Sequence, residues 1–204
     1  MSKNNKTKDL IFNTAVKLLQ TNGNLILKNI SDEANVNIAA INYYYGDKDT
    51  LIKEIISYQL NILKTRVSDL LDTFNAYKKN PEESMCNILT YLYDFCIENL
   101  GIIKFIFGVN NKQITEEAIY LYIHEITLDT DFMDKVMIYI NTISPFYTMS
   151  KYKIKYTQLL STFAFPLIVE LDLLKIDIAY FTSIKDTKFR EQYIQQLCKT
   201  FFET

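Results

Sequence analysis

The residues whose chemistry is easiest to interpret lie in one short stretch, NVNIAAINYYYGDKDTL, from Asn35 to Leu51. An asparagine amide can form the paired hydrogen bonds that adenine offers in the major groove of DNA, and alanine methyl groups can contact the methyl group of thymine. Tyrosine hydroxyls and lysine ammonium groups are common partners of phosphate oxygens. These side chains therefore predict a nucleic-acid contact, provided that one structural element holds them on a common surface.

Two short helices joined by a tight turn would provide that element. The spacing of apolar residues predicts one helix at residues 27–34 and a second at 38–44, with the turn at 35–37. Two helices of this length with a three-residue connection form a helix-turn-helix. Because the second helix of this motif enters the major groove, residues 38–44 are the expected recognition helix.

The residues of the turn and of the helix ends support this interpretation. Asn35 stands where the backbone most often needs a positive φ, which asparagine tolerates better than most residues. Asn37 is a suitable N-cap for the recognition helix, and Gly46 is a suitable C-terminal stop. Asp47 is expected to cap the next helix, whose apolar side chains begin at Leu51.

The positions of the recognition helix have different expected roles. Two consecutive alanines near its start would let the backbone approach the bases, and Asn42 would bind adenine. Tyr43 and Tyr44 would contact phosphates and sugars, whereas Tyr45, one turn after Ile41, is expected in the core. The predicted DNA-binding residues are Lys28, Asn37, Ala39, Ala40, Asn42, Tyr43, Tyr44 and Lys48.

Lysines near these positions would add positive charge. Lys28 and Lys48 fall at predicted helix N-termini, where the helix dipole also favours a phosphate. Lys3, Lys6 and Lys8 precede the first acidic residue, and they either follow the DNA backbone or form a solvated tail. The net charge of the chain is only −2, so any basic surface is expected to be local.

The composition of the chain indicates an all-α fold. Its 204 residues are 49% hydrophobic but include only four glycines and three prolines, too few for the turns of a many-stranded sheet. A three-helix DNA-binding domain is expected at residues 1–55 and a larger helical bundle at 56–204, with about nine helices in all. The helices expected outside the helix-turn-helix are residues 9–20, 47–72, 81–99, 101–108, 115–126, 130–143, 151–174 and 186–202.

Several classes of protein are not expected. The three cysteines are odd in number, and Cys86 and Cys96 are too far apart in one helix to pair, which argues against a disulfide framework and favours the cytoplasm. No apolar run approaches the roughly 20 residues that span a bilayer. With one histidine, His124, and neither a phosphate-binding glycine loop nor a nucleophile elbow, we expect no metal site, no cofactor and no enzymatic activity.

From Ile11 to Leu51 the sequence resembles the N-terminal domain of the tetracycline-repressor (TetR) family. The YYYGDKDTL run is similar to the family's most typical stretch, an aromatic-rich helix end followed by a short turn. The chain departs from the family at Asn35, where glycine is usual, and at Leu25 and Ile26, where two threonines are usual. The matching elements are Ile11-x3-Ala15-x2-Leu18-Leu19, Asn22-Gly23, Ile30-x3-Ala34-x-Val36, Ile41-x-Tyr43-Tyr44-Tyr45 and Lys48-Asp49-x-Leu51.

The resemblance implies a transcriptional regulator that binds a palindromic operator as a homodimer and is released from DNA by a small-molecule effector. Family members usually dimerise through their last two long helices, here 151–174 and 186–202. The expected interface residues are Ser161, Ala164, Phe165, Phe189, Tyr193, Leu197 and Phe201. The effector pocket is expected between helices of the C-terminal domain, where Tyr91, Phe95, Tyr122 and His124 are the predicted lining.

Two alternatives remain open at this point. The helix-turn-helix could be the docking surface of a helical protein–protein adaptor, which would show no salt-dependent affinity for DNA. The chain could also be a constitutive DNA-binding regulator without an effector, in which case the C-terminal domain would contain no pocket.

Overall fold

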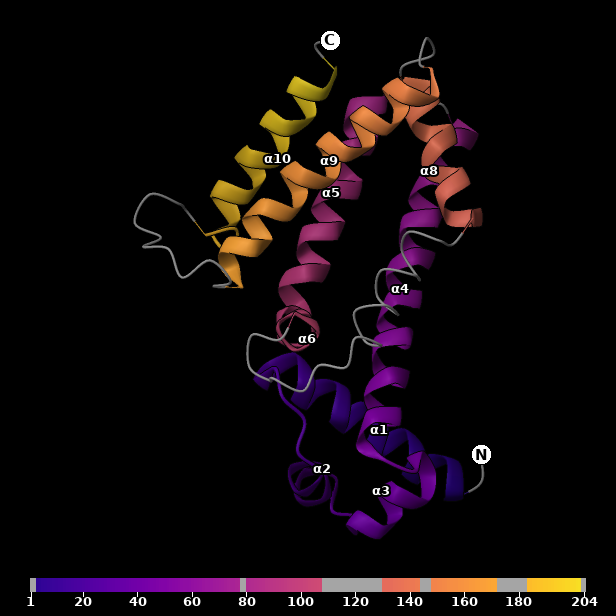
Figure 1. The fold of residues 1–204 in the computed structure, drawn as a ribbon, viewed down its shortest axis with the longest axis vertical. Coiled ribbons are helices and arrows are strands. Elements are labelled where there is room, and N and C mark those ends of the chain that lie inside the picture. Colours follow the sequence, from indigo (N-terminus) through magenta and orange to yellow (C-terminus); the bar gives the residue numbers. More distant parts are fainter. Residues whose placement is uncertain (1–2, 78–79, 108–129, 144–147, 172–182, 203–204) are drawn as a thin grey trace. The chain divides into compact units, whose positions relative to one another are not determined.

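The computed structural model of the chain describes residues 3–77, 80–107, 130–143, 148–171 and 183–202. These residues contain helices and no strand, which confirms the all-α class. The helix expected at 115–126 lies outside them, and none of the helices within them is long and apolar enough to cross a membrane. The nine helices of the described ranges are α1 (Lys3–Asn22), α2 (Leu27–Ala34), α3 (Ile38–Tyr45), α4 (Lys48–Tyr77), α5 (Pro81–Glu98), α6 (Leu100–Ile106), α8 (Thr130–Ile143), α9 (Met149–Glu170) and α10 (Thr187–Phe202) (Figure 1).

The helices divide into two compact units, and α4 contributes to both. Unit 1 contains the described residues 3–62 and 98–107. It therefore combines α1, α2, α3 and the first half of α4 with α6, a helix that comes much later in the sequence. Unit 2 contains the second half of α4 together with α5, α8, α9 and α10.

The core of unit 1 is built from one apolar stripe on each helix. Ile11, Ala15 and Leu19 of α1 follow one another at intervals of four residues, and all three are 0% exposed. Both α2 and α3 pack on α1, and they bury Ile30 and Ile41. Each large aliphatic side chain buried in this way contributes about 1.5–3 kcal/mol. This packing stabilises α2 and α3, which with eight residues each are too short to persist alone.

The first helix begins at Lys3, earlier than the predicted start at Asp9. Contacts with α3 stabilise this extra length: the Lys8 carbonyl accepts a hydrogen bond from the Tyr45 hydroxyl at 3.0 Å. The Lys8 Nζ atom also lies 5.2 Å from the centre of the Tyr45 ring, within the range of a cation–π interaction. Lys6 and Lys8 are exposed on a helix. These two residues therefore belong to a helix and not to a disordered tail.

The connections of the helix-turn-helix have the predicted geometry. Asn35 adopts a left-handed φ of 50°, and the Oδ1 atom of Asn37 accepts a hydrogen bond at 2.9 Å from the amide two residues on. Gly46 has a φ of 77°, and the Asp47 Oδ1 atom accepts a hydrogen bond from the Thr50 amide at 2.7 Å. This hydrogen bond lowers the pKa of the Asp47 carboxyl. The predictions for the turn and for both helix ends are confirmed, and the helix predicted at residues 38–44 extends one residue further than expected, to residue 45.

The short helix α6 approaches the end of α1 very closely within unit 1. A Cβ atom placed on Gly101 would lie 2.1 Å from the carbonyl oxygen of Gln20 and 2.4 Å from that of Leu19, distances that real Cβ atoms essentially never show. Beside this contact, Nε2 of Gln20 donates a hydrogen bond to Oδ1 of Asn99 at 2.9 Å, and Asn99 is 3% exposed. Residue 101 must therefore lack a side chain for α6 to pack on α1 as it does.

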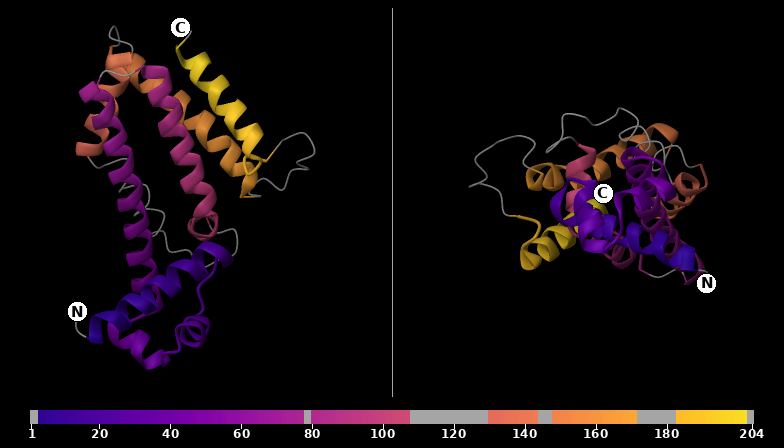
Figure 2. Two further views of the ribbon diagram at one scale, coloured as in Figure 1. Left: turned by 180° about the vertical axis from the view of Figure 1, so that it is seen from behind. Right: turned by 90° about the horizontal axis from the view of Figure 1, so that it is seen from below.

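In unit 2, α5 packs against both α9 and α10 (Figure 2). The Tyr93 side chain of α5 is fully buried, and its ring centroid lies 4.6 Å from that of Phe163 on α9 and 6.3 Å from that of Tyr193 on α10. An ion pair between Asp94 and Arg190, at 3.0 Å, forms a second link between α5 and α10. The helix α9 ends at residue 170, not at 174 as predicted, because an apolar run that continues past a helix end does not mark it.

Pro166 interrupts the hydrogen-bond ladder of α9, and a tyrosine of the neighbouring helix α10 compensates. Proline has no N–H group, so the carbonyl of Thr162, four residues earlier, has no helical donor. The Tyr193 hydroxyl donates to this carbonyl at 2.7 Å, and the Tyr93 hydroxyl donates to the next carbonyl, that of Phe163, at 3.2 Å. The helix α10 thus supplies the hydrogen bond that α9 cannot make for itself.

We expect Tyr193→Phe to lower the free energy of unfolding by about 1 kcal/mol, because it leaves the Thr162 carbonyl without a donor. In a Pro166→Ala background residue 166 has an N–H group that can serve this carbonyl, so the same substitution should cost much less. Urea unfolding of the wild type, both single variants and the double variant forms a double-mutant cycle. Equal costs in the two backgrounds would contradict the compensation.

Candidate nucleic-acid interface

The helix α3, which is the predicted recognition helix, has one buried face and one exposed face. Ile41 is 1% exposed and Tyr45 is 4% exposed, and these two residues, one turn apart, fix the helix in the core of unit 1. Asn42 is exposed, and Tyr43 is 77% exposed. Because the buried face is anchored at two points, the orientation of the exposed face is fixed as well.

The three consecutive tyrosines occupy three different environments. Tyr45 is buried, as predicted, and its burial raises the pKa of its hydroxyl to about 12. Tyr44 is half-buried, and its ring meets the Tyr43 ring edge-on, with the centroids 5.1 Å apart. This contact orients a Tyr43 side chain that is otherwise surrounded by solvent.

Asn37 and Asn42 differ in what their side-chain amides can bind. Asn37 uses its Oδ1 atom to cap α3, because this atom accepts the hydrogen bond from the Ala39 amide at 2.9 Å. Paired recognition of adenine requires both the oxygen and the nitrogen of one amide. The geometry therefore favours Asn42 for adenine, because the Asn37 oxygen already uses one of its two acceptor positions and is held in place by the cap.

The start of α3 presents small and aliphatic side chains. Ala39 is exposed and Ala40 is partly exposed, as their predicted role requires. Ile38, the first residue of the helix, is 38% exposed and was not among the predicted contacts. Helical periodicity did not indicate this exposure, because Ile38 precedes the buried residues Ile41 and Tyr45 by three and seven residues, the spacing of a single helix face. An aliphatic side chain at this position can contact the thymine methyl group.

The two predicted lysines stand at helix N-termini that differ in charge. Lys28 is exposed in the first turn of α2, and the N-cap Ile26 makes no side-chain hydrogen bond there. The first N–H groups of α2 thus keep their positive partial charge for an anion. Lys48, the first residue of α4, follows the N-cap Asp47, whose carboxylate offsets that charge. The N-terminus of α2 is therefore the better of the two for a phosphate.

The predicted pocket residues are only partly described. Tyr91 and Phe95 lie one turn apart on α5 with ring centroids 6.2 Å apart, and Phe95 is 9% exposed. Tyr122 and His124 lie outside the described residues. Within the described ranges, no group of three or more histidine, cysteine, aspartate or glutamate side chains could hold a metal ion.

The predicted dimer residues lie on α9 (Ser161, Ala164 and Phe165) and on α10 (Phe189, Tyr193, Leu197 and Phe201). Phe165 is 45% exposed, whereas Phe189 and Tyr193 are half-buried and stack with centroids 6.1 Å apart. The Tyr193 hydroxyl is engaged within unit 2 by the Thr162 carbonyl. The side chain of Phe201 lies outside the described part of the chain.

Comparison with known proteins connects this arrangement to one fold. No family model matches the sequence, and no curated protein matches it. The structure is similar to the crystal structure of a protein from Mesorhizobium loti that is classed as a TetR-family transcriptional regulator, with a TM-score of 0.70 and 11% sequence identity. The similarity covers 100% of this chain and 98% of the other. At this identity the similarity shows the fold alone, and the chain therefore has a TetR-type fold, as the resemblance of residues 11–51 predicts.

Proposed function

We propose that this chain is a DNA-binding transcriptional regulator, a repressor that binds a palindromic operator as a homodimer. One observation carries the proposal: α3 presents Asn42 and Tyr43 to solvent while Ile41 and Tyr45 anchor its other side. The second helix of a helix-turn-helix reads base edges from such a position. The TetR-type fold supports the same function, since it places this motif in an all-helical chain.

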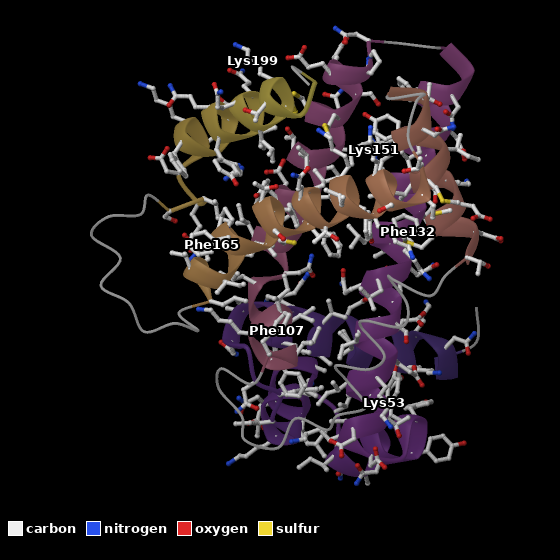
Figure 3. All side chains as sticks on the ribbon, turned by 45° about the horizontal axis from the view of Figure 1, so that its top comes forward. Lys53, Phe107, Phe132, Lys151, Phe165 and Lys199 are labelled. Atoms are coloured by element: carbon white, nitrogen blue, oxygen red, sulfur yellow. The ribbon has the colours of Figure 1, made fainter. Side chains whose placement is uncertain are left out.

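A homodimer would place two copies of α3 on two half-sites of the DNA. Dimers of this kind read half-sites about one helical turn, or a multiple of it, apart. We assign the dimer contact to α9 and α10, because Ile154, Leu160 and Phe165 of α9 are 54%, 42% and 45% exposed (Figure 3 labels Phe165). A second copy of the chain would remove these apolar side chains from water.

Release by a small-molecule effector is the finer part of the proposal. The helix α6 follows α5 directly in the chain and packs on α1 at Gly101. An effector that favours another position of α6 would also displace α1 and, through their shared core, α3. We place the ligand among the aromatic side chains of unit 2, with Tyr91 and Phe95 in the lining.

A protein–protein adaptor is the second candidate function. The exposed side chains of Ile38 and Tyr43 favour it, because aliphatic and aromatic residues are also typical of protein interfaces. The two candidates differ in their response to salt. Contacts with phosphates release counterions, so the affinity of a DNA-binding protein falls steeply as the salt concentration rises.

The proposal is tested by titrating the purified protein with the DNA that flanks its own gene, over a series of salt concentrations. We expect saturable binding with a steep negative salt slope. Asn42→Ala should weaken binding to the preferred site by about 10- to 100-fold, because a paired contact with a base is worth about 1–3 kcal/mol. It should leave the weaker, sequence-independent binding unchanged, since that binding depends on phosphates.

Asn61→Ala is the matched control, because it removes the same amide from an exposed position on α4, outside the recognition helix. This variant should bind like the wild type. Weak wild-type binding that does not depend on sequence, and that Asn42→Ala leaves unchanged, would refute the proposal and favour the adaptor.

A further inference from the structure

Two of the three cysteines lie opposite each other between α5 and α10 of unit 2. The two helices run antiparallel (Figure 2), and the ion pair between Asp94 and Arg190 sets their register. Cys86 precedes Asp94 by eight residues on α5, and Cys198 follows Arg190 by eight residues on α10. Eight residues of helix correspond to about 12 Å. Both cysteines therefore lie about 12 Å from the ion pair, at the same level along the two antiparallel helices.

The two thiols interact but differ in their access to solvent. Cys198 is 0% exposed, whereas Cys86 is partly exposed. Burial, and then the interaction with the Cys86 thiol, raise the pKa of the Cys198 thiol. The pair therefore consists of an outer thiol that a solute can reach and a buried inner thiol behind it.

Cys96 provides an internal comparison on the same helix. It is buried, 5% exposed, and burial alone raises the pKa of its thiol to about 12. Ten residues of helix place it about 15 Å from Cys86 along α5, too far for a disulfide. Since Cys198 lies against Cys86, Cys96 faces no other thiol.

We propose that Cys86 and Cys198 form an oxidation site, in which a hydroperoxide converts the two thiols into a disulfide that joins α5 to α10. This inference is independent of the proposed function in DNA binding. It rests on the register of the two helices and on the difference in exposure between the two thiols.

The reaction proceeds in two steps. The Cys86 thiol gives up its proton and its sulfur attacks the terminal oxygen of the hydroperoxide, so that an S–O bond forms, the O–O bond breaks, and the departing alkoxide, or hydroxide, takes up a proton and leaves as an alcohol or water. The Cys198 sulfur then attacks the Cys86 sulfur, the S–S bond forms, and the departing hydroxide takes the Cys198 proton to become water. Two thiols are thus oxidised and one peroxide bond is reduced.

The test is to treat the wild-type protein with hydrogen peroxide and to map its peptides without reduction. We expect an intramolecular cross-link between the peptides of Cys86 and Cys198, a fall from three free thiols to one, and full reversal by dithiothreitol. Cys96→Ser should form the same cross-link. In Cys198→Ser, Cys86 should stop at the sulfenic acid, which dimedone traps.

The wild-type peptide map decides the question even if a cysteine variant does not fold. Oxidation of Cys86 beyond the sulfenic acid without a cross-link would overturn the proposal. So would a cross-link that forms only between separate chains, or three thiols that all remain unchanged in the treated protein.

Discussion

Gly101→Ala is expected to lower the free energy of unfolding by about 2 kcal/mol, although glycine-to-alanine changes in helices usually stabilise a protein. Alanine would contribute about 1 kcal/mol through its helix propensity. The added Cβ atom, however, would lie 2.1 Å from the main-chain oxygen of Gln20. Overpacking costs about 1–3 kcal/mol, and the upper end applies because backbone atoms cannot rotate away as a side chain can. Urea unfolding, followed by the loss of helical circular dichroism, measures the difference.

Gly46→Ala is the matched control for this prediction. A Cβ atom at Gly46 would meet nothing within 4 Å, but the residue has a φ of 77°, so the cost is about 1 kcal/mol of backbone strain. Gly101→Ala should therefore be the less stable of the two variants. If it proves as stable as the wild type, α6 does not pack against the backbone of α1.

The helix-turn-helix could be predicted because local chemistry determines it. The left-handed φ of Asn35, the cap at Asn37 and the stop at Gly46 all follow from the residue at that position. The separation of Ile41 and Tyr45 from Asn42 and Tyr43 follows from helical periodicity, since buried residues recur one turn apart. The early start of α1 could not be predicted in this way, because its polar first turns depend on a contact with Tyr45.

Contacts between segments far apart in the sequence could not be predicted. The hydrogen bond between Gln20 and Asn99 joins residues 79 apart, and no periodicity indicates that α6 belongs to unit 1. The one signal was an isolated glycine, Gly101, within an apolar stretch, which often marks close packing. The pairing of Cys86 with Cys198 depends on the register of α5 and α10, which the sequence of either helix alone does not specify.

Within the candidate site, the sequence alone could not determine which polar side chains are available to DNA. The sequence indicates which residues of α3 are polar, but it treats Asn37 and Asn42 alike. The structure separates them, because the Asn37 oxygen is occupied by the Ala39 amide. It also adds Ile38, which shares a helix face with Ile41 and Tyr45 but is 38% exposed as the first residue of α3.

Two tyrosines of α3 are expected to serve different properties of the protein: Tyr45 its stability and Tyr43 its binding to DNA. Tyr45→Ala should lower the free energy of unfolding by about 3–5 kcal/mol, as for other large aromatic side chains removed from a core. Tyr45 is 4% exposed, and its hydroxyl binds the Lys8 carbonyl at 3.0 Å, so the variant loses packing and leaves an acceptor unsatisfied. This loss is a large fraction of the about 5–15 kcal/mol by which whole domains are stable.

Tyr43→Ala should change the free energy of unfolding by no more than about 0.5 kcal/mol, because 77% of its side-chain surface is already in water. It should instead weaken binding to all DNA sequences by about tenfold, the effect of losing one hydrogen bond to a charged phosphate. Urea unfolding and DNA titration of both variants test the two expectations together. If Tyr43→Ala unfolds the protein while Tyr45→Ala does not, α3 is rotated relative to the core. If Tyr43→Ala changes neither stability nor affinity, the exposed face of α3 does not contact DNA through this residue, and the adaptor function becomes the better explanation for an aromatic side chain held in solvent.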